Sequence, residues 1–186
     1  MVILFRVADC SCNVRSVILD YDVSANLFLL SNLNTFDTLL TIDSFRTFAR
    51  LIESTELETT LRSRIGFTLF APTDQGFSNL PGRFLDKLIG ARNSRLLREV
   101  LHYHFVEGRL RASELAAGQF ITTEQGHDLK ITSCDGVLRI NHARLVLPDI
   151  QTGDGIIHGI DELLIPGELA LVKYLSLSRS LSADGP

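Results

Sequence analysis

The sequence predicts an α+β fold in one domain, with helices in its first half and short strands in its second half. Apolar residues recur at helical spacing between residues 34 and 61, and the spacing changes to two from residue 119 onward. An Asp135-Gly136 pair between two alternating runs is a strong hairpin signal. We place the domain at residues 31–166, after an N-terminal extension at 1–30 and before a C-terminal tail at 167–186 that contains a short helix.

The first elements are helical. Phe36, Leu39 and Leu40 indicate one helix, and an apolar stripe over residues 45–52 indicates a second helix, capped by Asp43 or Ser44. A shorter helical piece covers residues 57–61. Each stretch has one apolar face, so we expect all three to pack on a common core.

Gly66 ends this helical region, and a strand at 67–71 follows with apolar residues on both faces. Thr73 or Asp74 then caps a helix. Residues 84–88 form a short helical turn. The stretch at 93–105 is predicted as a helix that passes into an extended segment at 104–108.

The second half of the domain has the period of strands. Four short strands are predicted at 119–123, 128–133, 137–141 and 143–150. The segments 155–161 and 162–166 are predicted as a last pair of strands. Helices followed by a run of strands are typical of an α+β domain.

Composition excludes several classes of protein. The chain has 186 residues, a net charge of −4 and no basic stripe, which argues against binding to nucleic acid. No stretch approaches the roughly 18 apolar residues of a membrane span. The first 12 residues lack the long apolar region of a secretory signal.

The acidic, glycine-rich segment at 153–166 raises the question of a metal or catalytic site. Read from Asp149, it lacks the oxygen ligands and the final glutamate of a calcium-binding loop. His158 and Asp161 are three residues apart on a predicted strand, so their side chains point to opposite faces. His102 and His104 supply only two ligands for a metal. We therefore predict no catalytic residues and no metal site, with His158 as a hydrogen-bonded core residue.

Three ordered segments resemble the fasciclin-like domain family. They are FTLFAPTDQGFSNLP at 67–81, LLREVLHYHFVEGRL at 96–110 and INHARLVLPDIQTGDGIIHGIDELLIP at 140–166. The resemblance implies N-terminal helices packed on a β-sandwich or wedge-like core of short strands. Gly76 replaces the family's usual alanine, which predicts a weaker helix by roughly 0.5–1 kcal/mol. Asp154 replaces its usual asparagine.

The resemblance also implies candidate site residues. Tyr103 and His104 match the family's tyrosine–histidine element, and Pro148, Asp149 and Ile150 match its Asp-Ile element, both linked with partner binding in animal relatives. Because the two family signatures lie on adjacent strands, we also predict a structural polar cluster. Its members are Thr73, Asp74 and His158.

The predicted function is a non-enzymatic interaction module for adhesion or for binding a protein, cell-surface or matrix partner. By resemblance its location is extracellular, periplasmic or at the cell surface, with only indirect membrane association. The alternative is a carrier of an apolar small molecule such as a carotenoid or lipid, which would be its only cofactor. That alternative is motivated by five phenylalanines in the helical half: Phe36, Phe45, Phe48, Phe77 and Phe84. The oligomeric state stays open.

Overall fold

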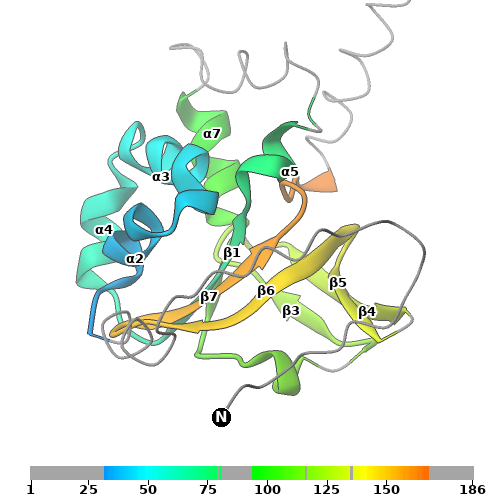
Figure 1. The fold of residues 1–186 in the computed structure, drawn as a ribbon. Coiled ribbons are helices and arrows are strands. Elements are labelled where there is room, and N and C mark those ends of the chain that lie inside the picture. Colours follow the sequence, from blue (N-terminus) through cyan, green and yellow to red (C-terminus); the bar gives the residue numbers. More distant parts are fainter. Residues whose placement is uncertain (1–31, 79, 81–93, 116, 135, 168–186) are drawn as a thin grey trace, which may run out of the picture.

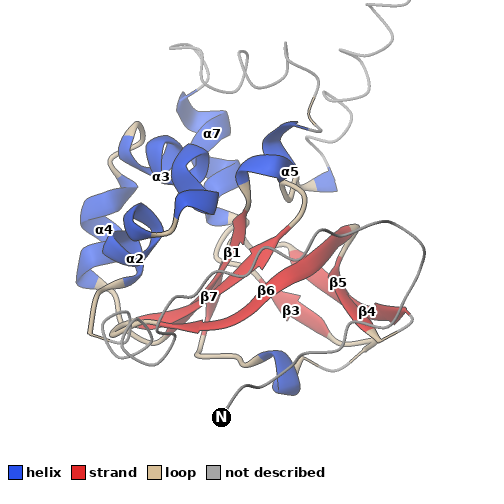
Figure 2. Cartoon of the chain, viewed as in Figure 1, coloured by secondary structure: helices blue, strands red, loops and turns tan. Residues whose placement is uncertain are grey.

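The computed structural model describes residues 32–78, 80, 94–115, 117–134 and 136–167 (Figure 1). The predicted N-terminal extension, the helical turn at 84–88 and the helix of the C-terminal tail lie outside these described residues. Helices gather on one side of the molecule and strands on the other (Figure 2), so the α+β class is confirmed.

The first helices are α2 (Thr35–Thr41), the 3₁₀ turn η1 (Asp43–Phe45), α3 (Arg46–Glu53) and α4 (Leu57–Ser63). The predicted capping of one helix by Asp43 or Ser44 is wrong, because the segment splits and Asp43 pairs with Arg46 at 2.5 Å. The start of α3 is instead capped by a side chain from the later helix α5 (Asp74–Ser78), because Asp74 Oδ1 accepts the Thr47 N–H at 2.8 Å.

The middle of the domain alternates strands and helices. These elements are β1 (Phe67–Pro72), α5 (Asp74–Ser78), α7 (Ser94–His102), β2 (Phe105–Glu107) and η2 (Ala112–Glu114). Gly76 lets α5 approach the chain that follows β7, because a Cβ there would lie 2.9 Å from the Asp161 carbonyl. The helix therefore needs a small residue at this position, which offsets glycine's low helix propensity.

The remaining strands are β3 (Phe120–Thr122), β4 (Asp128–Cys134), β5 (Val137–Ile140), β6 (Ala143–Gln151) and β7 (Gly155–Ile160). Together with β1 and β2 they form one seven-stranded sheet in the order β2-β1-β7-β6-β5-β4-β3, and among these pairs only β1 and β7 are parallel. A bridge between Val106 and Thr123 joins the two ends of this order. The wedge-like core is thus a sheet curled until its edges meet.

The predicted strand at 162–166 is wrong. Residues after Asp161 leave the sheet, although Leu163 and Leu164 are fully buried. The Leu164 N–H donates to a histidine ring, His104 Nε2, at 3.1 Å. Leu163 packs under the helices and Leu164 packs inside the curled sheet. The apolar run alone could not distinguish such burial from strand pairing.

Two hydrophobic cores explain the continuous burial of β1. The helix-side core lies between the helices and the sheet, and the sheet-side core fills the curled sheet. Alternate residues of β1 enter each one, with Leu69 in the first and Phe70 in the second. Large members of the helix-side core are Phe36, Phe45, Phe48, Leu101 and Ile157, and those of the sheet-side core are Leu129, Ile131, Ile140 and Leu164.

Candidate functional site

His104 lies just after α7 and is completely buried. Its Nδ1–H donates to the Val100 carbonyl at 2.7 Å, and its Nε2 accepts the Leu164 N–H at 3.1 Å. The ring packs 5.4 Å from the Phe48 ring. Burial lowers the pKa of His104 to about 4, so the ring is neutral near pH 7.

His158 lies in the middle of β7 and is also buried. Its Nδ1 accepts the Asp149 N–H at 3.1 Å, so the proton is on Nε2, which donates to the Leu110 carbonyl at 2.8 Å. The ring stacks on Phe70 at 5.5 Å. Burial lowers the pKa of His158 below its usual value. A core histidine with both ring nitrogens hydrogen-bonded is what the sequence predicted.

The predicted partners of that histidine are wrong. β7 pairs with β1 so that His158 lies opposite Phe70, three residues before Thr73. Thr73 donates its N–H to the Ile160 carbonyl at 2.9 Å, and the Asp74 carboxylate is engaged at α3. Adjacent strands do bring the two signatures together, but through the backbone rather than as one polar cluster.

Tyr103 points into the molecule and is only 4% exposed. Its hydroxyl donates to the Asp128 carbonyl at 3.2 Å and accepts from Asn141 Nδ2 at 3.0 Å. Burial raises the pKa of Tyr103. Together with His104, this residue joins parts of the fold, and neither side chain is available to a partner on the surface of the described domain.

Residues 148–150 lie where β6 departs from regular pairing with β7. Asp149 has a positive φ of 58° and its Oδ1 accepts the Ala112 N–H at 2.8 Å. Ile150 is half-buried against the helix-side core, whereas Pro148 is exposed. Of the predicted partner-binding residues, Pro148 alone is exposed.

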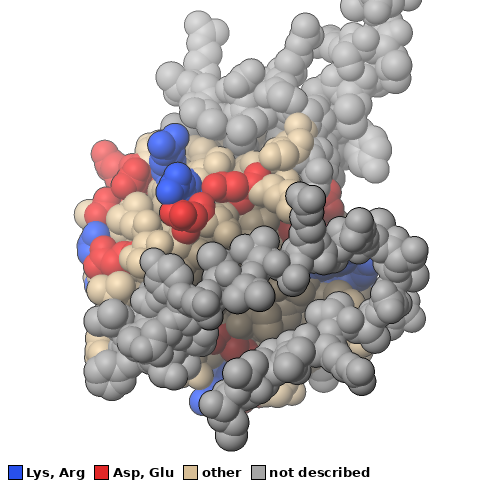
Figure 3. Space-filling model, viewed as in Figure 1, with Lys and Arg blue, Asp and Glu red and all other residues tan. Residues whose placement is uncertain are grey.

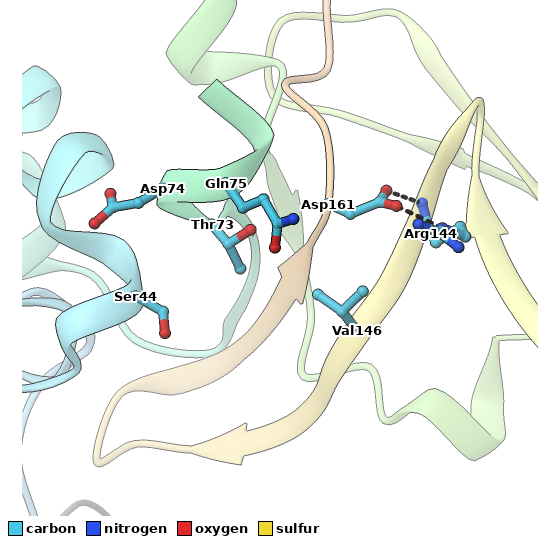
Figure 4. A pocket seen from close by; sticks show the side chains of 7 residues that line it. All are labelled: Ser44, Thr73, Asp74, Gln75, Arg144, Val146 and Asp161. Carbon is cyan, nitrogen blue, oxygen red and sulfur yellow. Dashed lines mark hydrogen bonds and ion pairs between the residues drawn. The ribbon is translucent and has the colours of Figure 1, made fainter. Parts of the chain in front are cut away.

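A cavity of about 300 Å³ opens where β6 passes α5 and η1 (Figure 4). Thr73, Gln75 and Val146 point toward it, and Asp161 turns to Arg144, with 2.5 Å between Oδ2 and Nε. Its other lining residues are Ser44 and Asp74. We call it the β6 cavity.

The sequence analysis named Thr73 and Asp74 as members of a polar cluster with His158, and it did not identify Arg144 or Val146 as lining a cavity. A signal for an exposed apolar surface was present in the run at 145–148, which is apolar at consecutive positions, whereas a half-exposed strand alternates. Val146 is 42% and Leu147 38% exposed. These side chains and Pro148 form a surface that we call the β6 apolar face.

The remaining histidine pair does not share a site. His102 is half-exposed with its Nδ1 3.4 Å from Glu124 Oε2, whereas His104 is turned into the core. Within the described ranges, no group of three or more histidine, cysteine or acidic side chains is placed to hold a metal ion.

The phenylalanines that motivated the carrier hypothesis belong to the helix-side core where they are described. Phe36, Phe45, Phe48 and Phe77 are buried there, and Phe84 lies outside the described residues. The β6 cavity is lined mainly by polar side chains. The carrier function stays a prediction, which an absorption spectrum of protein from its native source would test.

Among the described helices, none has both the length and the apolar character needed to cross a membrane. The two hydrophobic cores and the hydrogen bonds of the two buried rings define an α+β domain in which His104 and His158 join segments of the fold. Comparison with known proteins then gives the family. The fasciclin domain model matches residues 43–166, more than half of the chain, and the chain therefore belongs to the fasciclin domain family.

Individual relatives agree with this assignment. Protein sll1483 of Synechocystis is 29% identical over 124 residues, 67% of this chain and 68% of that protein. Transforming growth factor-beta-induced protein ig-h3 of Sus scrofa is 31% identical over 141 residues, 75% of this chain but only 20% of its own length. A solved FAS1 domain pair from the insect cell adhesion molecule Fasciclin I has a TM-score of 0.63 at 19% identity, covering 74% of this chain and 52% of that one.

Proposed function

We propose that this chain is a non-enzymatic interaction module that binds a protein partner through the β6 apolar face. The observation that carries the proposal is three consecutive exposed apolar residues, Val146, Leu147 and Pro148, on a strand of a closed sheet. Exposed apolar groups that are contiguous mark interaction sites more often than scattered ones do.

The carboxylates that line the β6 cavity beside this face are already engaged. Asp74 accepts the Thr47 N–H at the start of α3, and Asp161 pairs with Arg144. Over the helical side, acidic side chains are interspersed with basic ones in the view of Figure 3. The chain as a whole carries a net charge of −4, so we expect a partner with an apolar anchor flanked by a basic residue.

The family's partner-binding elements take a supporting role in this proposal. Asp149 links the bulge of β6 to η2 and to His158, which fixes where Pro148 is presented. Tyr103 and His104 brace the interior. Substitutions at these positions would alter binding through the shape of the domain rather than through lost contacts.

The absence of catalysis belongs to the same proposal. Both buried histidines are neutral near pH 7 and use both ring nitrogens for protein hydrogen bonds. A general base needs a free nitrogen within reach of a substrate. The location we propose is outside the cytoplasm, by analogy with the cell adhesion molecule Fasciclin I.

A direct test measures attachment of cells or matrix from the native source to surfaces coated with the full chain. The double variant Val146→Ser, Leu147→Ser should lose attachment at least about tenfold, because apolar contacts at the interface are removed. The matched control is Leu40→Ser, which changes a 49% exposed leucine on α2. Circular dichroism and thermal melts check that each variant folds.

Two variants of Asp149 distinguish direct contact with the partner from structural support of the β6 apolar face. Asp149→Asn keeps an oxygen acceptor and tolerates the positive φ, so attachment should be retained. Asp149→Ala removes the bond to Ala112 and should weaken attachment in proportion to its loss of stability. Unchanged attachment by the double variant at Val146 and Leu147 would refute the proposed surface.

A further inference from the structure

A second cavity, of about 350 Å³, lies at the opposite end of the β6–β7 pair from the β6 cavity. Its lining residues are Arg109, Arg111, Ser113, Glu114, Gln151 and Ile156. We call it the arginine cavity. Only Ile156 is apolar, so its walls offer hydrogen-bonding groups on most sides.

The two arginines are presented by a rigid segment. Leu110, between them, donates its N–H to Thr68 Oγ1 at 2.9 Å and accepts at its carbonyl from His158 Nε2. Its side chain packs against the sheet-side core. Arg109 and Arg111, on either side of this residue in the chain, both line the arginine cavity.

The arginines are not equally free. Arg109 Nη2 donates to the Gly153 carbonyl at 2.6 Å and to the Thr152 carbonyl at 3.3 Å, which fixes its guanidinium at the rim of the cavity. The guanidinium of Arg111 forms no ion pair within the described part of the chain. Two like charges that line one cavity favour the arrival of an anion.

One acidic group moderates this charge. Glu114 Oε2 accepts the Arg111 backbone N–H at 2.7 Å, at the start of η2. The cavity therefore carries two positive charges and one negative charge on a chain whose net charge is −4. A single anionic group matches the remaining charge better than a polyanionic cluster does.

We propose that the arginine cavity binds an acidic sugar residue of a polysaccharide. Its carboxylate pairs with the Arg111 guanidinium, the planar fork of which matches a carboxylate in two parallel hydrogen bonds. The sugar hydroxyls meet Ser113, Gln151 and the second oxygen of Glu114. The volume lies in the usual range for small-ligand sites, roughly 300–1,000 Å³.

The experiment uses the full chain, isotope-labelled for NMR, and three probes. An oligogalacturonate supplies the acidic sugar, its methyl ester removes only the charge, and inorganic sulfate supplies an anion without a sugar. The oligogalacturonate should shift the amides of residues 109–114 and 151, and the methyl ester should not. Arg111→Gln should weaken binding about tenfold, as expected for loss of a charge-assisted hydrogen-bonding group.

Arg46→Gln is the matched control, because it removes the same charge from an exposed arginine on α3 and should bind like the wild type. Three results would overturn the proposal: no shift at residues 109–114, equal affinity in Arg111→Gln, or sulfate binding as tightly as the acidic sugar. The variant at Val146 and Leu147 should bind the sugar normally, which keeps this test separate from the proposed protein-binding function.

Discussion

The two hydrophobic cores each hold one buried histidine against a phenylalanine, yet the two rings carry their proton on different nitrogens. His104, on the helix side, donates from Nδ1 to the preceding helix α7 and accepts from the chain beyond β7. His158, on the sheet side, donates from Nε2 and accepts the backbone N–H of the β6 bulge. The first ring joins interior segments, whereas the second supports residues that reach the surface.

Replacing His104 should have the largest effect on the free energy of unfolding, and it tests the helix-side core. His104→Ala leaves the Val100 carbonyl and the Leu164 N–H unpaired and opens a cavity beside Phe48, so the free energy of unfolding should fall by about 3–5 kcal/mol. Urea unfolding at pH 7 measures it. A loss below about 1 kcal/mol would show that water or repacking replaces the ring.

The pH dependence of stability should also be dominated by His104. Its folded pKa of about 4 lies below the ordinary 6.5, so the unfolded chain binds the proton first. Stability should be complete above pH 6.5 and fall by about 3 kcal/mol as the pH drops to about 4. Urea midpoints across this range measure the fall, and His104→Gln should flatten it. An equally steep fall in that variant would assign the proton uptake elsewhere.

His158→Ala tests the supporting role of the sheet-side ring. Two hydrogen bonds to backbone groups and the stacking on Phe70 are lost, which should lower stability by about 2–3 kcal/mol. Unlike His104→Ala, it should also shift the NMR signals of residues 146–150 and 109–112 in the folded state. If both alanine variants perturb the same signals, the two cores are not independent supports.

The smallest effect is expected from a substitution in α5, where Gly76 packs against the backbone of the segment that follows β7. Gly76→Ala gains helix propensity but pushes a Cβ against the Asp161 backbone, so we expect a net loss of about 1 kcal/mol. Thermal melts give the sign. A stabilised variant would mean that the 161–164 segment shifts easily, and His104 would then be held less firmly than we argue.

Most elements follow from the sequence because they depend on local periodicity and turn chemistry. The strand at 67–71 and the hairpin at Asp135-Gly136 are examples, since their burial and turn residues are set within a few positions. The prediction of a strand at 162–166 was wrong because an apolar run packs equally well as a strand or as buried irregular chain. The prediction of the hydrogen-bond partners of His158 was wrong for a different reason. The observed partners, the Leu110 carbonyl and the Asp149 N–H, belong to segments that are brought to His158 only by the complete fold.

The site was predicted unevenly for the same reason. Family resemblance located the segment at 148–150, but it could not tell that Pro148 is exposed while Tyr103 and His104 are inside. The β6 cavity combines residues from η1, α5, β6 and the turn after β7. No spacing rule connects such distant positions, so the cavity required the structure.

Hydrogen bonds attach the start of α2 to the turn before β7, and this attachment bears on how the domain would respond to a pulling force. The Leu33 carbonyl accepts the Gly153 N–H at 2.7 Å, and Asp154 Oδ1 accepts both the N–H and the hydroxyl of Thr35, at 2.7 and 2.6 Å. The chain is thus anchored just before β7 begins and departs at its other end. A pulling force between these points runs along β7, which pairs at six positions with β1 and also with β6. The hydrogen bonds of β7 would then be loaded together in shear rather than broken one by one, a geometry suited to holding two surfaces together.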